Sequence, residues 1–164
     1  MALFKPDRFL TRITKVDLDE LKSEGVECIL LDLDNTLLPR DTGVVPDDIL
    51  AWLDRARSMG FALALVSNNW HASVFDNARE LGLPIIHKSM KPFPLAYVIQ
   101  RRRMGCNRKN SIAIGDQLMT DVLGARLSGM RVILLLPLAQ KDLTHTLLLR
   151  KIEKKLLRGA TPTE

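Results

Sequence analysis

The chain has 164 residues with a net charge of +5, of which 46% are hydrophobic and 26% charged, as in a soluble globular domain with a real core. Neither of its two cysteines lies in a C-x-x-C pair, which argues against a disulfide framework or a zinc site. No apolar stretch approaches the roughly 20 residues that span a bilayer, and the first residues lack the apolar centre of a signal peptide.

Short apolar runs alternate with amphipathic segments along the chain. The predicted strands cover 27–34, 61–68, 84–88, 111–116 and 130–137. The predicted helices cover 46–60, 71–82, 94–105, 117–129 and 140–158. The first helix has Pro46 at its start, Asp47 in its first turn and Gly60 at its end, which are typical helix boundary residues. Apolar strands separated by helices predict an α/β fold of about five parallel strands, with helices on both faces.

Polar side chains follow the carboxyl ends of these predicted strands. They are Asp32 and Asp34, then Ser67 and Asn68, then Lys88 and Lys91, and finally Asp116 and Asp121, which follow Gly115. In an open parallel sheet the ligand crevice lies beyond the carboxyl ends of the strands. We therefore expect several carboxylates, one lysine and one hydroxyl to meet in a single site.

Asp32 and Asp34 pose an electrostatic problem. Alternation along a strand places both carboxylates on one face, where they repel each other, and burial of an unpaired charge is expensive. A cation between them, or a proton on one of them, removes the repulsion. Mg²⁺ prefers oxygen ligands and commonly takes one or two protein carboxylates together with water and substrate phosphate. The pattern therefore predicts a site for Mg²⁺ and a phosphate group.

Four segments resemble the motifs of the haloacid dehalogenase (HAD) superfamily of phosphotransferases. They are D-x-D-x-T at 32–36, an apolar strand ending in Ser67, Lys91 followed by proline, and G-D-x-x-x-x-D at 115–121. The wider pattern, with "GDQLMTDVLGA" and a basic tail, resembles the small YqeG-like branch of subfamily IIIA. Relatives in that branch act as phosphatidylglycerophosphate phosphatases. The resemblance implies a single Rossmann-like core with phosphatase activity.

The resemblance also assigns roles to the acidic residues. It implies that Asp32 is the nucleophile that takes the phosphoryl group as an aspartyl-phosphate, and that Asp34 is the general acid and base. Asp32, Asp116 and the backbone carbonyl of Asp34 would hold Mg²⁺. Asp121 would support the site, either by binding the metal through water or by orienting Lys91.

Substrate contact would fall to residues at the other strand ends. Ser67 and Lys91 would contact the phosphoryl oxygens, with Lys88 as the competitor for the role of Lys91. Asn68 and Thr36 are further candidates for substrate contact. Each has a structural alternative, because Ser67 and Asn68 could end a strand and cap the next helix, and Thr36 could stabilise the turn after the first strand.

Many HAD relatives carry an inserted cap domain over the site, and the motif spacing here leaves no room for one. Residues 36–67 and 67–91 each have room for one crossover helix and its connections. An uncapped site encloses a small metabolite poorly. We therefore expect the phosphate to be presented on something larger.

The basic segments at the two ends of the chain indicate which larger molecule could carry the phosphate. We expect one domain over 1–164, with a basic N-terminal segment (1–24) and a basic C-terminal helix (140–158). The tail places Leu148, Leu149, Ile152 and Leu156 on one arc of a helical wheel. This pattern is typical of an interfacial helix on an anionic membrane, although a terminal helix packed on the sheet would show it too. Nucleic acid is the less favoured candidate, because an aromatic content of 5% leaves few side chains on which bases could stack.

Three functions follow from the sequence. The leading one is a Mg²⁺-dependent phosphomonoesterase that acts on phosphatidylglycerophosphate, in the cytoplasm at the membrane surface. The second is the same chemistry on a soluble phosphate ester, such as a sugar phosphate or a nucleotide. The third is a non-catalytic binding protein, against which the intact set of motif residues argues.

Overall fold

The computed structural model describes residues 2–139 and 161–163. The basic helix expected over 140–158 lies outside the described residues. At the centre is a six-stranded sheet in the order β1-β6-β5-β2-β3-β4, and every neighbouring pair is parallel. The strands are β1 (Arg8–Leu10), β2 (Cys28–Leu31), β3 (Ala62–Val66), β4 (Ile85–Ile86), β5 (Ser111–Gly115) and β6 (Arg131–Leu135).

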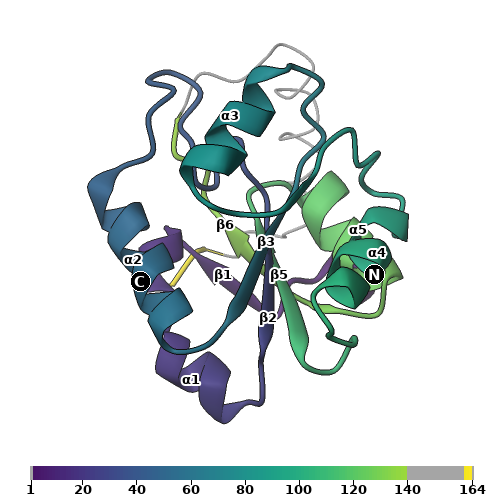
Figure 1. Cartoon of the computed structure of the whole chain (residues 1–164). Coiled ribbons are helices and arrows are strands. Elements are labelled where there is room, and N and C mark those ends of the chain that lie inside the picture. Colours follow the sequence, from purple (N-terminus) through teal and green to yellow (C-terminus); the bar gives the residue numbers. More distant parts are fainter. Residues whose placement is uncertain (1, 140–160, 164) are drawn as a thin grey trace.

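Helices cover both faces of this sheet. They are α1 (Leu18–Ser23), α2 (Asp47–Ser58), α3 (Ser73–Glu80), α4 (Leu95–Arg103) and α5 (Leu123–Leu127), with short turns η1 (Ala2–Phe4), η2 (Ile13–Lys15) and η3 (Leu118–Val122). In Figure 1, α1 and α2 lie on one side of the strands and α4 and α5 on the other. The α/β class and the two covered faces that the sequence predicts are confirmed.

The core consists of two layers because successive strand residues point to opposite faces. In β2, Ile29 and Leu31 pack with side chains from α1, α2 and α3. Cys28 and Leu30 pack on the opposite face, with side chains from α4, η3 and α5. All four β2 residues are buried, which explains why this strand reads as a continuous apolar run in the sequence.

The predicted strands are all present, and a sixth, β1, joins them at the edge of the sheet beside β6. Its three residues are too few to show a periodic pattern. The predicted strand over 27–34 ends earlier, at Leu31. The chain turns after it, because Asn35 takes a left-handed φ of 63° and Asp34 bridges to Leu38.

The predicted helix over 117–129 divides into two parts. Residues Leu118–Val122 form a π-helical turn, and α5 follows at Leu123–Leu127. In this turn the amides of Asp121 and Val122 both bond to the carbonyl of Gln117, at 2.9 and 3.2 Å. Such π turns inside helices are frequent at functional sites, and this one carries Asp121.

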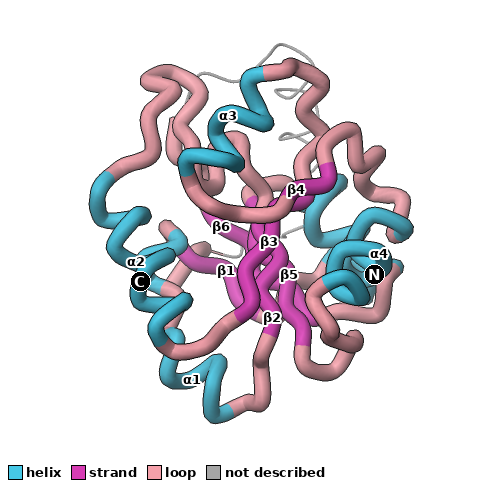
Figure 2. The backbone as a smooth tube through the Cα atoms, viewed as in Figure 1, coloured by secondary structure: helices cyan, strands magenta, loops and turns pink. Residues whose placement is uncertain are grey.

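The order of the strands creates a topological switch point between β2 and β5, where successive connections diverge. From β2 the chain proceeds outward to β3 and β4, and then returns to β5 on the other side of β2. Ligands in open α/β sheets bind at such a switch point, beyond the carboxyl ends of the strands. The loops that leave these ends lie toward the top of Figure 2.

The connections that follow β2 and β3 each contain a single helix. Between β2 and β3 the chain forms a loop and α2, and between β3 and β4 it forms a loop and α3. These segments are described throughout, and they hold no inserted domain, as the motif spacing predicts. Among the described helices, none has the length and apolar character needed to cross a bilayer.

Candidate active site

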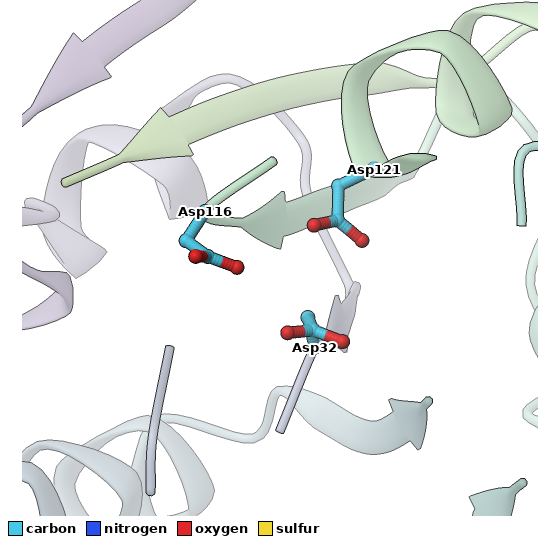
Figure 3. Close-up of side chains that lie close together, drawn as sticks. All are labelled: Asp32, Asp116 and Asp121. Atoms are coloured by element: carbon cyan, nitrogen blue, oxygen red, sulfur yellow. The ribbon is translucent and has the colours of Figure 1, made fainter. Parts of the chain in front are cut away.

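Three buried carboxylates meet at the switch point of the sheet. Asp32 follows the end of β2, Asp116 follows the end of β5, and Asp121 lies in the π turn. One oxygen from each lies within 4.8 Å of the others, and the three side chains point toward a common space in Figure 3. Because three close carboxylates repel one another, this arrangement calls for positive charge.

Lys91 supplies part of that charge. Its Nζ lies 2.6 Å from Oδ1 of Asp32 and 2.6 Å from Oδ1 of Asp121, and its side chain is only 2% exposed. Burial alone would lower the pKa of Lys91, but the charges of Asp121 and Asp32 raise it well above its usual value, so the ammonium stays protonated. Lys88, the competitor in the sequence, is exposed and lies over the ring of Trp70.

Asp32 is held in an environment that resists ionisation in the absence of a metal. Burial raises the pKa of Asp32 to about 7, and the charges of Asp121 and Asp34 add to this effect while Lys91 opposes it. The hydroxyl of Thr36 donates a long hydrogen bond of 3.4 Å to the other oxygen of Asp32. A divalent cation beside Asp32 would favour the ionised carboxylate.

The backbone around Lys91 is clamped by Asn68. The side-chain oxygen of Asn68 accepts from the amide of Lys91 at 2.7 Å and from the hydroxyl of Ser89 at 2.8 Å. Its amide nitrogen donates to the carbonyl of Lys91 at 3.0 Å. Asn68, which the sequence suggests as a substrate contact, therefore ties the loop after β3 to the loop that carries Lys91.

Asp34 lies at the same strand end, but its carboxylate is not part of the metal-competent group. It is half-buried and accepts two hydrogen bonds from the side-chain amide of Asn69, at 3.1 and 3.3 Å. Ser67 is fully buried, and its hydroxyl accepts from the amide of Asn69 at 3.0 Å. The motif residues at the ends of β2 and β3 are thus joined through Asn69.

Asp121 is fixed from three directions. Besides Lys91, the hydroxyl of Tyr97 donates to its Oδ1 at 3.3 Å, and the amide of Gln117 donates to its Oδ2 at 3.1 Å. Burial raises the pKa of Tyr97 well above its usual value, so the phenol remains a hydrogen-bond donor. The Asp121 carboxylate also lies close to the backbone of Gly115, since a Cβ on residue 115 would be 2.3 Å from Cγ of Asp121.

Two of these residues, Asn69 and Tyr97, have no site role in the sequence-based prediction, which considers Asn69 only as a possible strand end and helix cap. Asn69 directly follows the Ser67-Asn68 pair, so its place beyond a strand end was an available signal. Tyr97 lies within α4, and a buried helical tyrosine reads as ordinary core. Its contact with Asp121 spans 24 residues, which no local pattern indicates.

The arrangement suits chemistry on a phosphate. A carboxylate oxygen faces a space that is lined by further carboxylates and an ammonium, so a divalent cation and an anionic group could neutralise each other there. The oxygen-only donor set, Asp32, Asp116 and Asp121, fits a hard cation such as Mg²⁺ or Ca²⁺ better than a soft transition metal.

Comparisons with known proteins agree with this chemistry. The family model for haloacid dehalogenase-like hydrolases matches residues 3–129. The chain is 34% identical over 154 residues to the probable phosphatase YqeG of Bacillus subtilis (strain 168), covering 94% of this chain and 90% of that protein. It is also 23% identical over 137 residues to phosphatidylglycerophosphate phosphatase 1, chloroplastic/mitochondrial, of Arabidopsis thaliana, covering 77% of this chain and only 39% of that protein.

A solved structure shares the fold. It is the cobalt-bound deoxy-D-mannose-octulosonate 8-phosphate phosphatase (YrbI) of Haemophilus influenzae, which superposes with a TM-score of 0.57 at 13% identity. The match covers 84% of this chain and 90% of that chain. The resemblance drawn from the sequence motifs is confirmed: the chain belongs to the haloacid dehalogenase-like hydrolases and is an enzyme of the phosphatase type.

Proposed function

We propose that this phosphatase hydrolyses a phosphomonoester through an aspartyl-phosphate on Asp32, with Mg²⁺ as its metal. The observation that carries the proposal is the convergence of three buried carboxylates, with Lys91 2.6 Å from two of them. Asp32, Asp116 and the backbone carbonyl of Asp34 would hold Mg²⁺, and Asp121 lies close enough to take part through water. When bound, the metal would withdraw charge from the phosphoryl oxygens.

In the first step a carboxylate oxygen of Asp32 attacks the phosphorus atom, and the bond from phosphorus to the ester oxygen breaks. Asp34 gives its proton to the departing alkoxide, which leaves as the alcohol. The hydrogen bonds from Asn69 to the Asp34 carboxylate hold this group in one orientation. The ammonium of Lys91 balances the charge that gathers on Asp32 and the transferring group.

In the second step a water molecule attacks the phosphorus atom of the aspartyl-phosphate. Asp34, now ionised, takes the proton of that water, and the bond between phosphorus and the Asp32 oxygen breaks. Inorganic phosphate is released, and Asp32 returns as a carboxylate. Division of one hydrolysis into two displacements is the usual gain of covalent catalysis.

The remaining motif residues position these groups. The Ser67 hydroxyl accepts a hydrogen bond from the backbone amide of Asn69, so its own O–H can donate. Ser67 would therefore donate a hydrogen bond to a phosphoryl oxygen. Thr36 would orient the nucleophile through its contact with Asp32. Asn68 would act on the substrate indirectly, because its amide holds the backbone of Lys91.

We infer that the substrate is phosphatidylglycerophosphate, dephosphorylated to phosphatidylglycerol at the cytoplasmic face of a membrane. Two observations support this choice over a soluble ester. The described connections from β2 to β3 and from β3 to β4 hold no inserted domain that could close over a small metabolite. In addition, one relative carries that lipid phosphatase name, although this chain spans 39% of its length.

Release of inorganic phosphate from matched substrates tests the proposal. The purified full chain is assayed with phosphatidylglycerophosphate in mixed micelles, with glycerol 3-phosphate, and with a nucleoside monophosphate. Each assay is run with Mg²⁺ and after removal of divalent ions by a chelator. Glycerol 3-phosphate presents the same phosphorylated glycerol end without the lipid, so it isolates the contribution of the lipid.

The proposal expects Mg²⁺-dependent release with a higher kcat/KM on the lipid than on either soluble ester. A higher kcat/KM on a soluble ester would instead support a soluble metabolite as substrate. Absence of release from all three substrates would support a binding protein, provided that the preparation is folded. Asp32→Asn serves as the background control in every assay.

A further inference from the structure

Several large apolar side chains beyond the carboxyl ends of the strands are exposed to solvent. Among the described residues, the most exposed large apolar side chains are 62–69% exposed: Val44, Trp70, Met90, Phe93 and Leu95. All of them follow the carboxyl end of a strand, in the connections after β2, β3 and β4 or at the first position of α4. We call Trp70, Met90 and Phe93 the rim patch.

The rim patch is carried by two loops that are bonded to each other. The amide of Ser89 donates to the carbonyl of Ser67 at 3.0 Å, and the amide of Lys88 donates to the carbonyl of Asn69 at 3.3 Å. The Asn68 side chain adds the further bonds to the loop of Lys91 described above. Trp70, Met90 and Phe93 are therefore presented together on a fixed support.

Each loop of the rim patch also carries a residue of the site. Trp70 directly follows Asn69, whose amide bonds to Asp34. Met90 directly precedes Lys91, whose ammonium bonds to Asp32. Trp70 and Met90 are therefore each one residue from a side chain of the site, and we expect a surface that contacts the rim patch to lie near the site.

The loop that carries Met90 has an uncommon backbone conformation. Met90 and Lys88, two residues before it, both take left-handed φ values, 55° and 48°, which are uncommon for residues other than glycine. Strained loop residues persist where the surrounding contacts determine them, and they cluster at ligand-binding and active sites. Exposed apolar patches rimmed by polar groups mark sites of interaction with proteins or membranes.

We propose that the rim patch inserts into the surface of an anionic phospholipid bilayer and seats the site on the lipid phosphates; this rests on the proposed lipid-phosphatase function. A positive charge beside the patch favours an anionic bilayer. Nζ of Lys88 lies 4.9 Å from the centre of the Trp70 ring, so a cation and an amphipathic aromatic ring stand together, as at membrane interfaces. The net charge of +5 attracts the chain to anionic lipid.

The two tryptophans provide a direct test in the full chain. Trp52 is 7% exposed and donates to the carbonyl of Val16 at 3.1 Å, whereas Trp70 is 67% exposed. We expect vesicles that contain phosphatidylglycerol to shift the Trp70 emission to the blue, and brominated lipids to quench it. Trp70→Phe should abolish both responses, because Trp52 does not reach the lipid.

A binding assay with a matched control completes the test. The double variant Trp70→Ser, Phe93→Ser keeps Met90, because Met90 directly precedes Lys91 of the site. Its partition to the anionic vesicles should fall at least about tenfold, since two large apolar side chains no longer insert. Leu127→Ser, an exposed apolar residue (47%) at the end of α5, should bind vesicles like the parent. Hydrolysis of a soluble aryl phosphate should be unchanged in both variants.

The outcomes separate this proposal from the function on which it rests. A blue shift and quenching with no lipid turnover would uphold the docking surface and overturn the lipid substrate. Lipid turnover without a Trp70 response, or with undiminished vesicle binding in the double variant, would overturn the docking surface. If light scattering shows a dimer that only the double variant dissociates, with vesicle binding intact, the rim patch contacts a second copy and the bilayer proposal fails.

Discussion

The carboxylate of Asp121 lies in the space that a side chain on residue 115 would need. A Cβ placed on Gly115 would be 2.3 Å from Cγ and 2.5 Å from Oδ2 of Asp121, far inside normal contact. Gly115 ends β5, and Asp121 lies in the π turn that follows. The glycine of the G-D-x-x-x-x-D motif is therefore required so that the second aspartate can reach Lys91.

Gly115→Ala should destabilise the protein and strongly reduce phosphatase activity. Replacement of glycine by alanine at an unstrained position usually stabilises a protein through the unfolded state, but here the clash with Asp121 should dominate. We expect a loss of about 1–3 kcal/mol in the free energy of unfolding, as for overpacked cores, measured by urea denaturation. Unchanged stability and activity would show that Asp121 can occupy another position.

Asn69→Ala should slow the release of poor leaving groups more than that of good ones. The amide of Asn69 holds the Asp34 carboxylate, and an alkyl alcohol needs the proton from Asp34 far more than a nitrophenol does. Loss of a hydrogen bond to a charged group should cost about tenfold in kcat on an alkyl phosphate. Steady-state kinetics with both substrate types measure the difference, and equal effects on the two would argue against the acid role of Asp34.

Tyr97→Phe should modestly weaken Mg²⁺ binding, because it removes a hydrogen bond to Asp121. The hydrogen bond from Tyr97 to Asp121 is long, at 3.3 Å, so its removal should cost about 1 kcal/mol, at the level of a typical net hydrogen bond. Because Tyr97 contacts neither substrate nor Asp32 in this account, we expect the concentration of Mg²⁺ for half-maximal activity to rise. A fall in kcat at saturating Mg²⁺, with no change in the Mg²⁺ requirement, would contradict this positioning role.

Mg²⁺ should raise the melting temperature of the parent protein. A ligand that binds only the folded state adds about 2.7 kcal/mol of stability at a hundred times its dissociation constant. Asp116→Asn should remove most of this gain, because Asp116 belongs to the group of carboxylates that could hold the ion. Asp41→Asn, an exposed carboxylate in the loop after β2, is the matched control and should keep the full shift.

Much of the site could be predicted because its residues lie at strand ends. Asp32 and Asp116 directly follow β2 and β5, which pair side by side, and the apolar runs of both strands are visible in the sequence. The rule that parallel strands end at one edge is then enough to bring the two carboxylates together. The same reasoning places Ser67 and Lys91 nearby.

The rest depends on contacts that no local pattern shows. Tyr97 reaches Asp121 only because α4 packs over the face of the sheet beside the π turn, where Gly124 allows close approach to the ring of Tyr97. The strand β1 was missed because it is short and gains its pairing from β6, more than a hundred residues away. The carboxylate of Asp34 turns toward Asn69 instead of the other acids because the chain leaves β2 at Leu31 and turns at Asn35.

The most direct test of the account is the capture of the phosphorylated enzyme. The full chain is mixed with Mg²⁺ and a phosphomonoester, quenched with acid during turnover, digested, and analysed by mass spectrometry. We expect one phosphoryl group on the peptide that contains Asp32, and none in Asp32→Asn, which should lose at least about a hundredfold in activity while it stays folded. A phosphoryl group on another residue, or full turnover by Asp32→Asn, would contradict the proposed nucleophile.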